Sequence, residues 1–164
     1  MKVKDIMEPL TNWLTPEMSI LEAIRTMQHT KRGHGLAVNG IVVLDNEMRL
    51  VGILSTRDIL RVVIPSFMYL HEITDEKTWV GLRLDRTEKL DSMTVGKIMT
   101  EDVRVISYNE TILRCADLML VEQRRRLPVI GTEGKVVGVV YLRDVYNAVT
   151  NLLCHTRSAE VAVG

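Results

Sequence analysis

The sequence is poor in aromatic residues and in cysteine, and it has no excess of charge of either sign. Aromatic side chains make up 4% of its 164 residues, which argues against binding of single-stranded nucleic acid by base stacking. Lysine plus arginine and aspartate plus glutamate both number 21, so the formal net charge is zero. Because general nucleic-acid and anionic-membrane binders are usually basic, we expect neither nucleic acid nor a membrane among the partners.

Features of secreted, membrane-spanning and catalytic proteins are also missing. The two cysteines, Cys115 and Cys154, form no Cys-x-x-Cys motif and no disulfide framework, which indicates a reducing cytoplasm. Acidic residues interrupt the N-terminus, as they would not in a signal peptide. The longest uncharged apolar stretch, residues 62–70, contains Pro65 and is far shorter than the roughly 20 residues of a membrane helix. We find no P-loop, no nucleophile–base pair and no metal-ligand spacing, so the sequence predicts no enzyme and no metal site.

What the sequence does contain is an internal repeat. Residues 3–7, Val-Lys-Asp-Ile-Met, resemble residues 95–99, Val-Gly-Lys-Ile-Met, at an offset of 92. Residues 50–58 resemble residues 136–144 at an offset of 86, so the first copy carries six additional residues between its two blocks. These residues lie near the glycine-rich stretch 33–40. Blocks in the same order with the same apolar pattern indicate a duplication.

Each copy has the pattern of a strand, a helix, two strands joined by a turn, and a closing helix. In the first copy Ser19 begins the helix, and Glu22 completes a capping box. Gly134, in the second turn, suits the positive φ that hairpin turns require. The predicted short strands are residues 11–15, 41–44 and 50–54 in the first copy and residues 103–107, 127–130 and 136–140 in the second.

The two copies are separated by a segment of different composition. This insert interleaves charged residues with apolar ones, including Trp79, and we interpret it as one or two helices. The chain beyond Cys154 is weakly patterned and is expected to fray. The predicted organisation is a first repeat over residues 1–64, a helical insert over 65–92, a second repeat over 93–154 and a flexible tail over 155–164.

The order Ile-Met, capped helix, Leu-Pro-Val-Ile, Val-Val-Gly-Val-Val and Arg-Asp resembles the cystathionine-β-synthase (CBS) domain. Two copies in tandem resemble a stand-alone CBS-domain pair, or Bateman module. The resemblance implies an α/β (α+β) fold of two β-α-β-β-α units related by a pseudo-two-fold axis, with ligand-binding clefts between them. It also implies a regulatory adenosine-containing ligand rather than a required cofactor: AMP, ADP, ATP or S-adenosylmethionine. The expected assembly is a homodimeric disk of four CBS units that relays ligand binding to an unidentified regulated protein.

The first copy has the full ligand motif of this family, Gly-h-h-Ser/Thr-x-x-Asp, where h is apolar. The resemblance assigns polar ligand contacts to Ser55 and Asp58 and a phosphate contact to Arg57. A carboxylate suits the two ribose hydroxyls because it offers two acceptor oxygens and no donor. The adenine would lie against apolar residues, either near residues 11–14 with Ile53 or, in the second copy, near Val103 to Val105 with Val139.

The second copy keeps only part of this motif. Arg143 and Asp144 match, but Tyr141 replaces the small hydroxyl residue. Arg124–Arg126 precede the Leu-Pro strand, and arginine is well shaped for phosphate; Arg126 is the candidate contact there. Each copy thus retains a different part of the pattern, which favours one functional cleft over two.

Simpler interpretations remain for the same residues. Asp58 and Asp144 stand at strand-to-helix junctions, where aspartate is a common helix cap. The three arginines suit a solvated helix C-terminus, which favours cations. If these structural roles were the whole account, the chain would be a ligand-free dimerisation or protein-interaction module.

Overall fold

The computed structural model describes residues 1–64 and 87–160 and divides them between two compact units. Unit 1 joins Met1–Thr11 to the chain from Arg104 onward, and unit 2 runs from Asn12 to Val103. The fold is mixed α+β, as predicted. Most of the predicted insert, including Trp79, lies outside the described residues, and residues 87–92 are helical.

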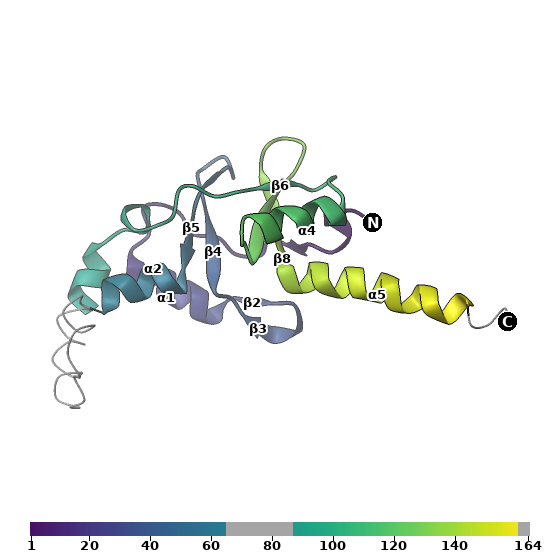
Figure 1. Ribbon diagram of the computed structural model, residues 1–164. Coiled ribbons are helices and arrows are strands. Elements are labelled where there is room, and N and C mark those ends of the chain that lie inside the picture. The colour runs from purple at the N-terminus through teal and green to yellow at the C-terminus, as the bar shows by residue number, and fades with distance from the viewer. Residues whose placement is uncertain (65–86, 161–164) are drawn as a thin grey trace, which may run out of the picture. The chain divides into compact units, whose positions relative to one another are not determined.

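Unit 1 is built on a four-stranded sheet in the order β1-β8-β7-β6. Figure 1 labels β6 and β8 of this sheet. Strands β7 and β8 form an antiparallel hairpin, β1 pairs antiparallel with β8, and β6 runs parallel to β7. Helices α4 and α5 contact each other, and buried residues of α4, including Cys115, pack with the sheet into one core. The elements are η1 (Val3–Asp5), β1 (Glu8–Pro9), β6 (Ile106–Ser107), α4 (Ile112–Val121), β7 (Arg126–Ile130), β8 (Val136–Tyr141) and α5 (Leu142–Glu160).

Unit 2 has a similar arrangement, but its edge strands are reduced to single β-bridges. Its central hairpin is β4 and β5, flanked by single bridges from Leu14 to Val43, parallel, and from Thr100 to Ile53, antiparallel. The predicted first strands of both copies are therefore shorter than expected. The elements are α1 (Ile20–His29), β2 (Lys31–Arg32), η2 (Gly33–Gly35), β3 (Leu36–Ala37), β4 (Gly40–Leu44), β5 (Leu50–Ser55), α2 (Thr56–Val63) and η4 (Val95–Lys97).

The packing units differ from the sequence repeats, because each unit takes its first segment from the other repeat. The backbone N–H of Val3 donates to the carbonyl oxygen of Glu110 at 2.9 Å, within unit 1. The matching bond in unit 2 joins Val95 N to Met18 O at 2.8 Å. The boundaries predicted from sequence, with residues 1–64 and 93–154 as separate repeats, therefore do not coincide with the packing units. Backbone groups must find partners wherever the chain is buried, and these segments find theirs outside their own repeat.

The first helix of the first repeat begins as predicted, and the corresponding helix of the second repeat has a similar N-cap. The Oγ of Ser19 accepts from Glu22 N at 3.2 Å, while Glu22 Oε2 accepts from Ser19 N at 2.9 Å, which confirms the capping box. The N-cap of α4 is Thr111, whose hydroxyl accepts from Arg114 N at 3.2 Å. The inward positions are occupied by Ile20, Ala23 and Met27 in α1 and by Ile112, Cys115 and Met119 in α4.

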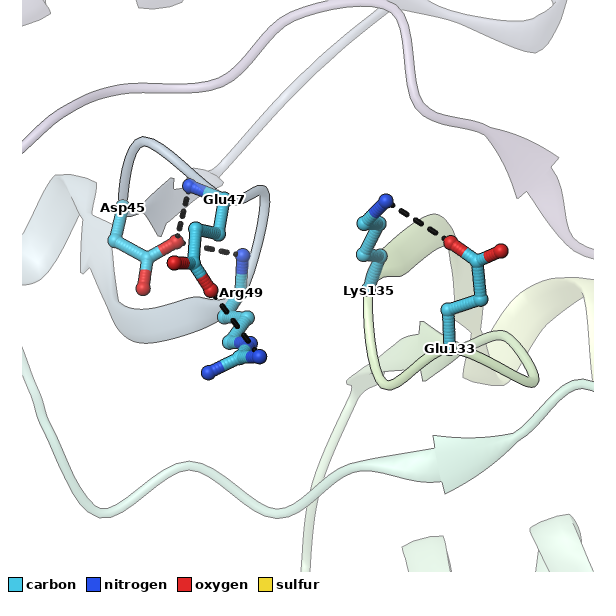
Figure 2. Close-up of polar contacts among 5 residues, drawn as sticks. All are labelled: Asp45, Glu47, Arg49, Glu133 and Lys135. Carbon is cyan, nitrogen blue, oxygen red and sulfur yellow. Dashed lines mark hydrogen bonds and ion pairs between the residues drawn. The ribbon is translucent and has the colours of Figure 1, made fainter.

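The two hairpin turns each contain a residue with positive φ, but the residues differ. Figure 2 shows side-chain contacts at the two turns, made by Asp45, Glu47 and Arg49 in one and by Glu133 and Lys135 in the other. Gly134 has φ of 74°, which confirms the predicted positive φ. In the first turn Met48 takes the equivalent position with φ of 64°. One oxygen of Asp45 accepts from the backbone amides of Glu47 and Arg49, both at 2.9 Å. These two bonds support a turn that lacks the glycine.

The structure gives defined secondary structure to the region of the six additional residues and to part of the expected tail. The six additional residues of the first copy belong to a small antiparallel hairpin, β2–β3, closed by η2. Helix α5 continues to Glu160, beyond the point where the tail was expected to begin; residues 161–164 lie outside the described part. Across the described residues, no helix combines the length and apolar character of a membrane span.

Candidate functional site

The site predicted in the first copy lies where β5 ends and α2 begins, entirely within unit 2. Ser55 is the N-cap of α2, and its side chain accepts from Asp58 N at 3.3 Å. In return, Asp58 Oδ2 accepts from Ser55 N at 2.9 Å and from Ser55 Oγ at 2.6 Å. The sequence Ser-x-x-Asp therefore forms a capping box, and the structural role proposed for Asp58 is confirmed.

The hydrogen bonds between Asp58 and Ser55 that form the cap use only one carboxylate oxygen, Oδ2. Asp58 Oδ1 has an ion-pair contact of 4.0 Å with Arg61, and the Asp58 side chain is 10% exposed. A carboxylate has about four acceptor sites in all, so capping and a further hydrogen bond are chemically compatible. Arg57 stands in the first turn of α2 with its side chain exposed. The structure thus brings Ser55, Arg57 and Asp58 together at one helix end.

The glycine of the motif has a packing role that sequence reasoning missed. A Cβ at Gly52 would lie 2.7 Å from Met99 Sδ and 2.9 Å from the carbonyl oxygen of Thr100. At Gly138, in unit 1, it would collide with the carbonyl oxygen of Glu8 and lie 3.2 Å from Met7 Sδ. In each unit the Ile-Met segment from the other repeat passes over this glycine. The Ile-Met and Gly blocks recur in both repeats of the sequence, and this recurrence was the signal from which their contact could have been predicted.

The apolar candidates Ile53, Val103 and Val139 are divided between the two units. Ile53 is half-buried in β5, and its N–H and carbonyl both bond to Thr100 at 2.9 Å. Val103 belongs to unit 2, and its grouping with Val139 stays a prediction. Val139 lies half-buried in β8 of unit 1, and its neighbours across the sheet are Glu8 and Pro128.

The corresponding junction in unit 1 lies where β8 meets α5. Arg126 pairs with Tyr141 across the β7–β8 ladder, and both side chains are half-buried. Asp144 is half-buried in the first turn of α5, whereas Arg143 is exposed. The first residue of α5, Leu142, donates its N–H to Arg125 O at 2.9 Å. The arginine run and the second-copy motif therefore meet at one end of unit 1.

Sequence reasoning also missed a pair of contacts at equivalent places in the two units. In unit 1, Nε and one terminal nitrogen of Arg104 each lie 2.6 Å from Glu122 Oε1. The Arg104 guanidinium lowers the pKa of Glu122. In unit 2, Asn12 Nδ2 donates to Thr30 Oγ1 at 3.1 Å. Arg104 and Glu122 correspond to Asn12 and Thr30 at the offset of 92. The alignment of the repeats could therefore have shown that the positions are equivalent, but it could not have shown that the side chains are in contact.

Residues 3–65 and 95–151 match the family model of the CBS domain. The chain is 27% identical to the chloroplastic CBS domain-containing protein CBSX2 of Arabidopsis thaliana, over 96% of this chain and 67% of that protein. The crystal structure of CBSX2 in complex with AMP superposes with a TM-score of 0.67 at 24% identity, covering 92% of this chain and 97% of that one. The cytosolic domain of the Mg2+ channel MgtE in complex with ATP gives a TM-score of 0.62 at 23% identity, covering 87% and 46%.

Proposed function

Since its two matched segments make this chain a member of the CBS-domain family, we propose that it is a regulatory module that binds an adenosine-containing ligand. The candidate ligands are AMP, ADP, ATP and S-adenosylmethionine. The observation that carries the proposal is the Ser55–Asp58 arrangement at the start of α2. Support comes from two structural neighbours of the same fold, whose crystal structures contain AMP and ATP.

The chemistry of the α2 end suits a ribose and its phosphate. Asp58 supplies acceptor capacity for hydroxyl groups, and the carboxylate is already oriented by its two bonds from Ser55. The exposed guanidinium of Arg57 lies in the first turn, where the helix N-terminus also favours an anion. Such a site binds and orients a ligand without transferring a group, so the proposed role is non-catalytic.

A route from the ligand to the rest of the chain starts at β5. Ile53 is hydrogen-bonded in both directions to Thr100, and Gly52 lies under Met99. A ligand that shifts the β5–α2 junction therefore acts directly on the segment leading to Val103, after which the chain enters unit 1. A ligand can shift such an equilibrium only by its difference in affinity for the two states. A partner protein regulated by this module would respond to the shift in its conformational equilibrium.

The proposal also includes a homodimer and a cytoplasmic location. Three apolar side chains of α4, Leu113, Leu120 and Val121, are between 70% and 75% exposed, which favours a protein contact at this helix. This observation equally supports the alternative function, a ligand-free interaction module. The cytoplasmic location rests on the cysteines, because Cys115 and Cys154 are both unpaired.

The test is a thermal-shift measurement with AMP, ADP, ATP and S-adenosylmethionine, with GMP as the base control. A ligand at 100 times its dissociation constant stabilises by about 2.7 kcal/mol, or roughly 5–11 °C for a chain of this size. Asp58→Ala removes the capping box and the proposed ribose contact. We expect its unliganded melting temperature to fall by about 2–4 °C and its ligand-induced shift to disappear.

The matched control is Glu22→Ala, which removes the capping box of α1 in the same unit. It should show a similar loss of stability and keep the full ligand shift. Flat curves with millimolar ligand, together with an unchanged dimer, would reject the adenosine-binding proposal in favour of the interaction module. An equal loss of ligand shift in both variants would assign Asp58 to capping alone.

A further inference from the structure

We propose that two copies of this chain pair through unit 1 of each, by a surface that combines helix α4 with the C-terminal extension of α5. The inference rests on the homodimer of the proposed function, and it adds which unit carries the contact and that like units meet. The surface is defined by six exposed apolar side chains: Leu113, Leu120 and Val121 of α4, and Tyr146, Leu152 and Leu153 of α5.

The first argument is the place where exposed apolar side chains gather. Of the eleven large apolar side chains that the described residues expose, six belong to this surface, and each of the six is more than half exposed. The two helices that carry them contact each other, and Figure 1 shows α5 continuing past α4 toward the C-terminus. Apolar side chains that gather on the exposed faces of neighbouring helices are typical of a protein–protein contact.

The second argument is that the fold itself does not require this surface. At the offset of 92, Leu120 and Val121 of α4 correspond to Gln28 and His29 of α1, which are polar and exposed. Helix α1 therefore presents polar side chains to solvent at two positions where α4 presents apolar ones. Because the apolar surface belongs to one unit, two copies bury it most completely when unit 1 of one copy meets unit 1 of the other.

The third argument is that the apolar stripe of α5 continues past the core of unit 1. Val145 and Ala148 are buried, whereas Leu152, one turn further along the same face, is 54% exposed. Helix α5 has 19 residues where its counterpart α2 has 8, and the side chains of residues 151–154 are all exposed. Most helical stability in proteins comes from the packing of an apolar face. A packing partner on this extension therefore accounts for its helical structure.

The fourth argument identifies the partner as a second copy. Helical spacing places Leu113, Arg114, Asp117, Leu120 and Val121 on the face of α4 opposite its buried residues. Arg114 Nη1 donates to Asp117 Oδ2 at 2.7 Å, so this face carries one charge of each sign. A second α4 in antiparallel orientation brings its Leu113 toward Leu120 and Val121, and its Asp117 toward Arg114. The face is thus complementary to itself, which a two-fold symmetric interface requires.

The test is sedimentation velocity of the whole chain over a range of concentrations. Leu120→Gln copies the residue of unit 2, and Leu153→Gln makes the same change in the extension of α5. We expect each to raise the dissociation constant of the dimer about tenfold or more, because two-fold symmetry removes two leucines from the interface at once. The matched control is Leu60→Gln, at a leucine of α2 in unit 2 that is 52% exposed, and it should leave the dissociation constant unchanged. Melting temperatures verify that each variant is folded.

Amide hydrogen exchange tests the part played by the extension of α5. In the dimer the amides of residues 152–154 should be protected, and Leu120→Gln, measured where it is monomeric, should speed up their exchange about tenfold or more. The amide of Val145, which lies in the packed part of the same helix, should keep its protection. Equally fast exchange of residues 152–154 in dimer and monomer would remove α5 from the proposed surface.

The outcomes separate this surface from the rest of the proposed function. If Leu60→Gln weakens the dimer as much as Leu120→Gln does, the pairing of like units is rejected and the homodimer stands. If the unaltered chain stays monomeric at the highest concentration reached, both the homodimer and this surface are rejected, whether or not it then binds lipid vesicles. Flat AMP thermal-shift curves for the unaltered chain bear on the adenosine site alone, and an AMP shift, where present, should persist in Leu120→Gln.

Discussion

Replacement of Gly138 by alanine tests the exchange of first segments between the repeats. The added Cβ would collide with the carbonyl oxygen of Glu8, a backbone atom in the strand paired with β8, and Met7 Sδ would lie 3.2 Å away. The flexible Met7 side chain could rotate away from the added Cβ. The Glu8 carbonyl could not, because its backbone is paired with β8 and the whole strand would have to move. Overpacking of this kind costs about 1–3 kcal/mol, and the backbone collision places Gly138→Ala in the upper part of that range. We therefore expect a fall in melting temperature of about 4–12 °C.

The assay combines urea unfolding with amide hydrogen exchange. Leu10 N–H bonds to Val137 O at 3.2 Å, so its protection should fall in Gly138→Ala, while amides of α4 keep theirs under native conditions. The control is Gly134→Ala, where no atom lies within 4 Å of the added Cβ and only the positive φ of 74° opposes alanine. Its cost should be about 1 kcal/mol. A smaller loss in Gly138→Ala than in Gly134→Ala, or unchanged exchange at Leu10, would refute the reasoning.

Two further predictions concern single residues of unit 1. Gln123 follows α4 with φ of 52°, a conformation in which glycine is favoured, so Gln123→Gly should raise stability by about 0.5–1 kcal/mol in urea unfolding; no gain, or an equal gain in Gln123→Ala, would contradict this. Burial raises the pKa of Cys115 from 9.0 to about 11, so at pH 8 a thiol reagent should label the exposed Cys154 and leave Cys115 unlabelled until the protein unfolds. Because the folded pKa is the higher one, this thiol's contribution to stability is complete below about pH 9 and is lost as the pH rises through about 11; rapid labelling of Cys115 in the folded protein would show that it is not buried.

Much of the local structure could be predicted because it depends on residues near in sequence. The Ser19–Glu22 capping box and the positive φ of Gly134 follow from side-chain chemistry and backbone sterics within a few positions. Met48 shows the limit of this reasoning. It adopts the same left-handed conformation without being glycine, because Asp45 supplies two side-chain hydrogen bonds to the turn.

The candidate site was predicted in part. Ser55 and Asp58 are together because they are three positions apart across a helix start, a spacing that the sequence displays directly. The sequence could not show that Oδ2 of Asp58 accepts the hydrogen bonds of the helix cap. It also could not show that Val103 and Val139 belong to different units. Both facts depend on which backbone segments pair, and pairing partners distant in sequence leave no local signature.

The sequence by itself determined the duplication, the order of helices and strands in each copy, and the residues that begin the principal helices. These follow from periodicity and capping, which act over one or two turns of chain. Only the tertiary structure decided that each unit takes its first segment from the other repeat, and that Gly52 and Gly138 are needed where those segments cross. It alone paired Arg104 with Glu122, because an ion pair 18 positions apart forms only when packing brings an extended segment against the end of a helix.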